Sequence, residues 1–484
     1  MKKLRLLLAS LVIAGFAFTA CEDMDDTAVP VNDFIWKGLN LYYLWQEQVP
    51  NLADDRFDNQ EQLNDFLQAY QTPEQLFERL LYHAPDGTKL DRFSVIRSDF
   101  RVLENALQGV SKSNGMDFEL LYTSETGNDL FAFVRYILPG SDAEAKGVKR
   151  GDIFYAINGI QLNDENFGGL LGQETYTINL ADFNDGDITP NGEEITLTKS
   201  EYAENPIYMV NTYMAGSKKV GYFIYNGFYS NYDNELNAAI AQLAAEGIDE
   251  LILDLRYNGG GSVRTATYLG SMLTGNYTGQ VFAQQRWNSK LQSYYEANNP
   301  ESLLNRFSDE LSNGQAINKL NLERVYILTT SATASASEMV INGLKSYIEV
   351  VQIGETTLGK NVGSVTLYDS PNFGRENRSG SHRYAMQPIV LSIANADGEG
   401  DYTEGIDPSV ELYEDLDNMG VLGDPNEPYL AAALDIIDGK SRKSIHPGKK
   451  NKRFKDSKSM RPFGNDMYIE EMPEGSLSLL KDLQ

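Results

Sequence analysis

The stretch that decides the fold is ELILDLRYNGGGS, residues Glu250–Ser262. It begins with a short run rich in leucine and isoleucine, which is typical of a strand buried in a sheet. The run leads into three consecutive glycines, and a helical pattern over 263–273 follows at once. A strand, a tight loop and a helix in this order predict an α/β layer in which helices pack on a sheet.

The same alternation continues on both sides of this stretch. We expect each apolar run to form a strand and each amphipathic run to form a helix. The predicted strands are 220–224, 250–256, 324–328 and 348–353, and the predicted helices are 232–246, 263–273 and 335–347.

Two short motifs in this region make chemical sense together. Ser335 lies in TASASE, residues 333–338, at the start of a predicted helix, and Lys360 ends GETTLGK, residues 354–360. A hydroxyl at a helix start and a lone lysine on a glycine-flanked loop are what a serine nucleophile with a lysine base requires. Such a lysine must be neutral, which demands burial away from water and from carboxylates. The pair predicts a hydrolase that needs no histidine.

The transition state of such a reaction also needs hydrogen-bond donors for an oxyanion. The amide of Ala336 lies at the start of the helix, where no intrahelical acceptor is available to it. Gly260 is our choice for the second donor, because a triple-glycine loop lets the backbone approach a substrate closely.

Each of these residues also has a plainer interpretation. Ser335 with Glu338 fits a structural capping box, and Ser337 or Ser331 could be the reactive hydroxyl instead. Lys360 alone is typical of a solvated loop, and a triple glycine is typical of a turn. Only the combination and order of the motifs favour the catalytic interpretation.

Other chemistries find little support in the sequence. The three histidines are His83, His382 and His446, and none lies in a nucleophile-like context, so a Ser-His-Asp triad is possible but unsupported. Neither a metal-binding cluster nor a nucleotide-binding loop is visible, so we expect no cofactor.

The N-terminal residues have the features of a targeting signal. Residues 1–20 have a basic start and a short apolar run, which indicate a signal peptide. Phe18-Thr19-Ala20-Cys21 resembles a bacterial lipobox, so we expect a lipid anchor on Cys21; an ordinary secretory signal is the alternative. Residues 21–30 form an acidic tether. The expected location is that of an outer-membrane lipoprotein that faces the periplasm or lies on the cell surface.

Net charge excludes one class of partner. Without residues 1–20 the chain carries 38 basic and 69 acidic side chains, a formal balance of −31. Nucleic acid is therefore not an expected partner. The length predicts two to four domains, and the sequence leaves the oligomeric state unknown.

Four regions follow the tether. Residues 31–112 have helical patterns and predict a helical bundle, and residues 113–205 have the short strands and turns of a β-rich domain. Residues 206–437 form the predicted catalytic domain. Residues 438–484 begin with a basic stretch that predicts a flexible tail.

The β-rich region resembles a known peptide-binding module. Gly140–Leu162, with Gly-Val-Lys-Arg-Gly-Asp-Ile at its centre, looks like a PDZ domain of the bacterial protease type. Such a domain adds a peptide as a strand to a sheet edge. Gly115, Met116, Asp117 and Phe118 would supply the turn that receives a terminal carboxylate, although the charge of Asp117 disfavours tight binding of free C-termini. A PDZ-shaped spacer without peptide affinity is the alternative.

Three motifs together resemble one enzyme family. Asp254–Gly261, Ser335–Glu338 and Gly354–Lys360 are similar to the core motifs of the C-terminal processing proteases, the S41 serine peptidases. Four residues after the lysine that family commonly has glutamine, which helps to hold the active-site groups; Ser364 stands there and would have the supporting role.

The resemblance implies a multidomain α/β protein with a ClpP/crotonase-like catalytic domain. It also implies a membrane-anchored, extracytoplasmic serine endopeptidase whose partner is a polypeptide substrate. The alternative is a non-catalytic lipoprotein that binds a peptide or another ligand on the same scaffold, and the Ser364 departure favours it.

Overall fold

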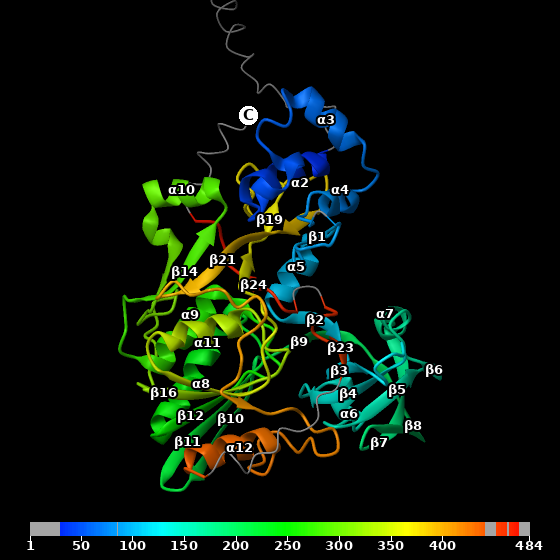
Figure 1. Cartoon of the computed structure of the whole chain (residues 1–484), viewed down its shortest axis with the longest axis vertical. Helices are drawn as coiled ribbons and strands as arrows, with labels where there is room; N and C mark the ends of the chain where they lie inside the picture. Colours follow the sequence, from blue (N-terminus) through cyan, green and yellow to red (C-terminus); the bar gives the residue numbers. More distant parts are fainter. Residues whose placement is uncertain (1–29, 85, 441–451, 462–463, 474–484) are drawn as a thin grey trace, which may run out of the picture.

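The computed structural model describes residues 30–84, 86–440, 452–461 and 464–473. The predicted signal peptide, Cys21 and the tether up to residue 29 lie outside the described residues. In Figure 1 a helical region lies at one end of the molecule, above the main α/β region, and a β-rich region lies beside the latter. This arrangement confirms a multidomain mixed α/β fold with an N-terminal helical region.

The N-terminal region contains several helices, in line with the helical patterns of residues 31–112. The helix α4 has a clear start, because the side chain of Thr72 accepts the N–H of Gln75 at 3.3 Å and Pro73 occupies the first turn. Aromatic and aliphatic residues of α2 are buried in the main core, and the Phe34 ring lies 6.0 Å from that of Phe373. The elements are α2 (Pro30–Tyr42), η1 (Gln46–Gln48), η2 (Pro50–Leu52), α3 (Gln60–Gln68), α4 (Pro73–Arg79), β1 (Val95–Arg97) and α5 (Phe100–Leu107).

The β-rich region has its own hydrophobic core and an antiparallel sheet in the order β23-β3-β4-β5-β7-β8, in which β23 is Arg453–Asp456. Asn158 and Gly159 form the hairpin turn between β5 and β6, and both have positive φ. Its elements are β2 (Val110–Ser113), β3 (Met116–Tyr122), β4 (Leu130–Ile137), α6 (Asp142–Ala145), β5 (Ile153–Ile157), β6 (Ile160–Gln161), α7 (Phe167–Gly172), β7 (Thr175–Asn184), β8 (Asp187–Thr198) and β9 (Ser200–Ala203).

The α/β region is built on a six-stranded sheet in the order β10-β11-β12-β16-β17-β22. Its strands from β11 to β22 are parallel, and β10 is antiparallel to β11. Residues of α8, α9 and α11 share one core with one face of the sheet, and α12 packs on the other face. The elements are β10 (Ile207–Ala215), β11 (Lys218–Tyr225), η3 (Ser230–Tyr232), α8 (Asp233–Glu246), β12 (Glu250–Asp254), α9 (Val263–Thr274), β16 (Arg324–Thr329), α11 (Ala336–Lys345), β17 (Glu349–Gly354), β22 (Val410–Glu411) and α12 (Pro428–Ile437).

A second six-stranded sheet, in the order β13-β24-β18-β21-β14-β15, connects this region to the helical end. Strand β1 of the helical end pairs with β20 in a separate three-stranded sheet, which has the order β1-β20-β19. The elements are β13 (Gly261–Ser262), β14 (Val281–Trp287), α10 (Ser289–Asn298), η4 (Pro300–Leu303), β15 (Leu304–Arg306), β18 (Val362–Ser364), β19 (Leu367–Tyr368), β20 (Ala385–Gln387), β21 (Ile389–Asn395), β23 (Arg453–Asp456) and β24 (Met467–Tyr468).

The C-terminal segment differs from the flexible tail that its basic composition predicts. In the described parts of residues 452–473, β23 joins the β-rich sheet and β24 joins the second sheet. The reason is that partners distant in sequence supply the hydrogen bonds and counter-charges that the local composition lacks. In Figure 1, β23 lies between the β-rich and α/β regions. β24 lies in the second sheet between β13 and β18.

Candidate active site

Ser335 lies on a strained turn at the start of α11. Its backbone has φ 66° and ψ −115°, a conformation that residues with a Cβ rarely adopt. The side chain is fully buried, and its Oγ has no hydrogen-bond partner in the described part of the chain. The turn also forms a capping box with Glu338, as the plainer interpretation of the sequence expects. A buried hydroxyl held on a strained turn is in addition a feature of functional sites.

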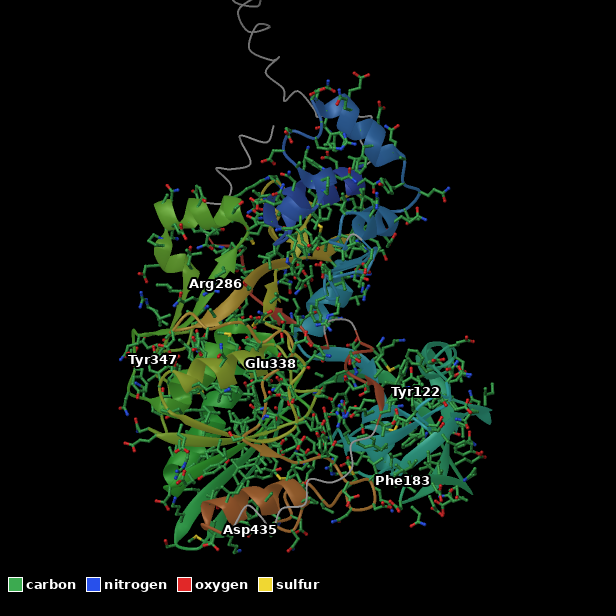
Figure 2. The ribbon with its side chains drawn as sticks, viewed as in Figure 1. Tyr122, Phe183, Arg286, Glu338, Tyr347 and Asp435 are labelled. Atoms are coloured by element: carbon green, nitrogen blue, oxygen red, sulfur yellow. The ribbon has the colours of Figure 1, made fainter. Side chains whose placement is uncertain are left out.

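Glu338 brings the Ser335 turn and the Lys360 loop together. One carboxylate oxygen, Oε2, accepts the N–H of Ser335 at 2.7 Å and that of Lys360 at 2.8 Å. The other oxygen accepts the N–H of Gly359 at 2.7 Å and the hydroxyl of Thr357. Burial raises the pKa of Glu338, and these hydrogen bonds oppose that rise. Figure 2 labels Glu338 near the centre of the α/β region.

Lys360 is fully buried, as a lysine base requires, but its surroundings are not those that we expected. Its Nζ donates to the backbone carbonyl of Asn465 at 2.8 Å and forms an ion pair with Asp466. It also lies 4.3 Å from the centre of the Phe93 ring. The expectation of a site without carboxylates is therefore wrong for this structure, because the C-terminal segment brings Asp466 to the amine.

The glycine loop lies directly against the nucleophile turn. A Cβ added to Gly260 would lie 2.6 Å from Cβ of Ser335 and 3.0 Å from the amide nitrogen of Ala336. Gly260 has φ 111°, which also favours glycine. Its own N–H donates to Oδ1 of Asn258 at 2.9 Å, so this predicted oxyanion donor is engaged within its loop. Asn258 in turn accepts the N–H of Ala334 at 3.1 Å, which fixes the loop to the turn.

Ser364 lies on β18 and connects two elements. Its Oγ donates to the carbonyl of Met467 at 3.0 Å and accepts the side-chain amide of Gln387 at 3.0 Å. Both Ser364 and Gln387 are buried. The hydroxyl therefore holds the C-terminal segment beside the strand that follows Lys360.

The alternative nucleophiles have other partners. Ser337 donates its hydroxyl to the carbonyl of Asn258 at 3.1 Å, and the hydroxyl of Ser331 accepts a hydrogen bond from Arg453. Ser335 thus differs from both in having an unpartnered Oγ.

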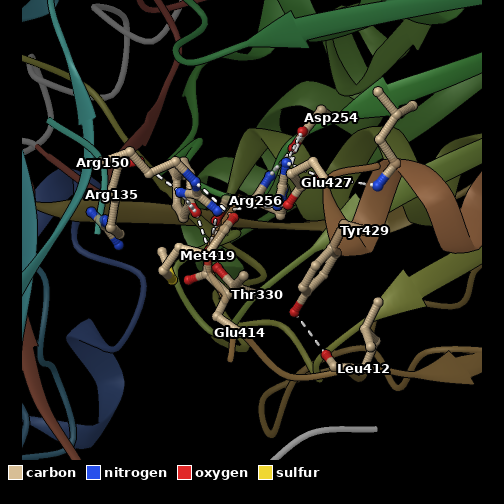
Figure 3. Close-up of polar contacts among 12 residues, drawn as sticks. Arg135, Arg150, Asp254, Arg256, Thr330, Leu412, Glu414, Met419, Glu427 and Tyr429 are labelled. Carbon is tan, nitrogen blue, oxygen red and sulfur yellow. Dashed lines mark hydrogen bonds and ion pairs between the residues drawn. The ribbon is translucent and has the colours of Figure 1, made fainter. Parts of the chain in front are cut away.

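A buried ion network anchors the strand that leads into the glycine loop. Arg256 binds Asp254 and donates to Glu427 at 2.7 Å (Figure 3). Arg150 of the β-rich region extends the network, since it lies 3.1 Å from Glu414 and donates to the hydroxyl of Tyr257 at 2.6 Å. The expected Asp254–Arg256 pair is therefore one part of a network that connects two regions of the molecule.

The residues of the predicted carboxylate-binding turn lie at the start of β3. Gly115 has φ 88°, and a Cβ on it would collide with Ser141. Asp117 is buried in an ion pair with Arg135 at 2.6 Å. Burial opposes ionisation of this carboxyl, but Arg135 and Lys458 hold its pKa below the ordinary value. The pairing explains how the Asp117 carboxylate can be buried at the start of β3.

Sequence reasoning missed three contributors to the site. The sequence predicts Glu338 only as part of a helix cap, whereas Phe93 and Asp466 lie far from the motifs in sequence. No local pattern in the sequence indicates the roles of Phe93 and Asp466.

The described residues have neither a membrane-spanning helix nor a metal-binding cluster. None of the helices among these residues combines the length and the apolar character that a bilayer crossing needs. The described residues also contain no group of three or more His, Cys, Asp or Glu side chains that could hold a metal ion.

Comparison with known families agrees with the motifs. Residues 219–387 match the model of peptidase family S41, and residues 30–95 match that of the peptidase S41 N-terminal domain. Over these residues the chain is similar to the S41 serine peptidases. Its curated relatives include carboxyl-terminal processing proteases.

Individual relatives are distant in sequence. The chain is 28% identical to the carboxyl-terminal-processing protease of Picosynechococcus sp. over 239 residues, which cover 49% of this chain and 52% of the relative. It is 27% identical to that of Synechocystis sp. over 306 residues, which cover 62% of this chain and 64% of the relative. The chain thus spans between half and two thirds of these relatives.

A solved structure matches over more of the chain. A protein of Bacteroides fragilis NCTC 9343 described as an S41 protease is 29% identical, with a TM-score of 0.64. The match covers 84% of this chain and 97% of that structure. The likeness therefore extends beyond the α/β region to most of the described molecule.

Proposed function

We propose that this chain is a serine endopeptidase that cleaves polypeptides with Ser335 as nucleophile and Lys360 as base. One observation carries the proposal: a single oxygen of Glu338 accepts the amides of both residues, beside a strained serine whose Oγ is unpartnered. The match of residues 219–387 to the model of peptidase family S41 supports the same roles.

The reaction begins when Lys360 is neutral. Its amine takes the proton of the Ser335 hydroxyl as Oγ attacks a peptide carbonyl, which forms a tetrahedral oxyanion. The resulting ammonium gives the proton to the leaving amine as the C–N bond breaks, and water then hydrolyses the acyl-enzyme by the same route. The amide of Ala336 donates to the oxyanion. The Gly260 amide can add a second hydrogen bond once it turns from Asn258.

The remaining parts of the proposal concern location and substrate capture. We assign a lipid anchor to Cys21, and hence a place in the outer membrane that faces the periplasm or the cell surface. The β-rich region is proposed to be a PDZ-like module that delivers an extended polypeptide at the edge of β3. The ClpP/crotonase-like description of the catalytic domain belongs to the same proposal.

The paired state of Lys360 favours a second candidate, a binding protein without catalysis. An ammonium bonded to Asp466 cannot accept a proton, and the Gly260 amide is already engaged. In that case the scaffold would bind a peptide or another ligand and leave it intact.

Hydrolysis of casein and of a fluorogenic peptide by the purified chain tests the proposal. Ser335→Ala should remove all activity, whereas Ser337→Ala should retain it. Both serines are buried at the start of α11, so the second variant is a matched control. Equal activity of Ser335→Ala and the unaltered chain would refute the assigned nucleophile, and activity lost only in Ser337→Ala would reassign it.

A further inference from the structure

The C-terminal segment, residues 453–461 and 464–470, binds the β-rich region as an added strand at its first part. β23 pairs antiparallel with β3, with Arg453 opposite Leu121 and Asp456 opposite Glu119. The N–H of Ser457 donates to the carbonyl of Phe118 at 2.9 Å, so the contact reaches the predicted carboxylate-binding turn. Main-chain pairing at a sheet edge is how such edges bind extended peptides.

A side chain of this strand also packs on the β-rich region. The ring of Phe454 lies 5.4 Å from that of Tyr122 on β3 and 5.0 Å from that of Phe167 on α7. Both contacts are edge-to-face, and Phe454 is partly buried against the core of this region. The segment thus contacts the β-rich region through both its backbone and a side chain, as a bound extended peptide would.

Basic residues of the segment neutralise buried carboxylates of the body. Arg453 lies 3.1 Å from Glu119 and 2.7 Å from Glu355. Lys458 and Arg461 lie 3.5 Å and 3.6 Å from Glu204. These three glutamates are at most 6% exposed, and buried carboxylates are costly without a cation. The path is therefore built to receive a polypeptide with basic side chains.

The segment then enters the catalytic region. β24 lies between β13 of the glycine loop and β18 of the strand after Lys360, in parallel pairing with both. A Cβ on Gly259 would lie 2.1 Å from the carbonyl oxygen of Gly464. A substrate strand that approached Ser335 between these two loops would need the same space.

Asp466, near the end of the segment, prevents the proposed catalytic pair from reacting. Asp466 holds the Lys360 ammonium, so the amine cannot accept the Ser335 proton. Ser335, Lys360 and Gly260 are all buried, so a polypeptide in solution cannot reach them in this arrangement.

We propose that residues 453–461 and 464–470 are a tethered inhibitor that occupies the substrate path from the β3 edge to Lys360, and that a basic polypeptide substrate displaces it. This inference rests on the proposed function, because only a catalytic chain has a substrate path to block. It assigns the substrate class as extended polypeptides with basic residues that pair with β3.

Two full-length variants test the inhibitor at its two ends. Phe454→Ala weakens the anchor on the β-rich region, far from the reacting atoms, and Asp466→Ala releases Lys360. Loss of two edge-to-face aromatic contacts should raise kcat/KM on a basic fluorogenic peptide about tenfold. Asp466→Ala should raise it as well, because the amine is then free to act as base.

Matched controls separate release of the segment from general loosening. Phe183→Ala removes an aromatic side chain that stacks on Phe131 elsewhere in the same β-rich region. Asp435→Ala removes a surface carboxylate of α12 that pairs with Lys440. Both controls should keep the activity of the unaltered chain, and circular dichroism checks that all four variants are folded.

Hydrogen exchange supplies a readout that does not depend on turnover. In full-length Ser335→Ala, a saturating basic peptide should speed amide exchange in 452–461 and 464–473 while it protects β3. Unchanged exchange in those residues, with the peptide bound, would overturn displacement.

The outcomes distinguish this inference from the proposed function. If the unaltered chain cleaves and both Phe454→Ala and Asp466→Ala are equally or less active, the segment is part of the working site and the inhibitor is refuted. If no variant cleaves any substrate and Ser335 reacts with no fluorophosphonate, the proposed function itself fails.

Discussion

Replacing Glu338 with glutamine should separate the two halves of the active site. The carboxylate accepts four hydrogen bonds, two at each oxygen. Glutamine keeps only one acceptor oxygen, so its NH₂ group must face two former donors. The hydroxyl of Thr357 can rotate to accept, but the backbone N–H groups cannot.

The magnitude follows from the bonds that are lost or weakened. A hydrogen bond to a charged group contributes about 1.5–3 kcal/mol, roughly twice as much as a neutral one, so the loss of one backbone bond and the weakening of the other three cost about 3–6 kcal/mol. Glutamine avoids the burial of a charge, which offsets part of that cost and leaves an expected loss of about 3 kcal/mol in the free energy of unfolding. A shift of about 1 Å between Ser335 and Lys360 would lower kcat about a hundredfold.

Thermal unfolding and peptide hydrolysis measure the two effects on the same preparation. Glu235→Gln is the matched control, since Glu235 is exposed on α8 and should tolerate the change in both assays. An unfolding temperature and a kcat for Glu338→Gln that both match those of the control would refute the role of Glu338 as the connection between the two loops.

Three other substitutions probe the surroundings of the site. Gly260→Ala places a Cβ 2.6 Å from Cβ of Ser335, at a position whose φ of 111° already favours glycine. The value of kcat should therefore fall at least about a hundredfold, and a fully active variant would contradict the close approach of the two loops. Arg256→Met leaves two buried carboxylates without their cation and should destabilise the chain by about 3–5 kcal/mol in urea unfolding; a stable variant would show that the network is dispensable. Burial raises the pKa of Asp233 to about 6. Its neutral form therefore stabilises the folded state at low pH, and this contribution to the free energy of unfolding is lost as the pH rises from about 4 to 6. Asp233→Asn should therefore be the more stable chain above pH 6 by up to about 3 kcal/mol, and equal thermal unfolding of both chains at pH 7 would contradict the raised pKa.

Much of the fold could be predicted because its elements carry local patterns. The helix that begins at Pro73 has its N-cap threonine and proline in sequence, and the Asn158-Gly159 turn has its own dipeptide. The buried strand 250–254 and the helix after the glycine loop follow from apolar runs of the right length.

The candidate site could be predicted only as far as its motifs extend. The Ser335 and Lys360 motifs lie on the expected turn and loop, and Glu338 holds them together. Contacts over long sequence separations could not be predicted. Asp466 reaches Lys360 across 106 residues, and no periodicity encodes such a pairing.

The C-terminal segment illustrates why composition alone misleads. A stretch rich in lysine and arginine repels itself in isolation and reads as an unfolded tail. Here Glu119, Glu204 and Glu355 supply the opposite charges from three distant parts of the chain. Whether such a segment is ordered depends on the charges of the residues that it contacts, and the sequence of the segment itself does not show these charges.

Reaction with a fluorophosphonate probe, followed by mass spectrometry of the labelled peptide, tests the catalytic pair most directly. The unaltered chain and Asp466→Ala are labelled side by side, so that occupancy by the C-terminal segment does not obscure the result. The label should fall on Ser335, more strongly in Asp466→Ala, and should disappear when Lys360 is also replaced by alanine. Absence of label from both chains, or a label that persists without Lys360, would contradict a serine activated by a buried lysine.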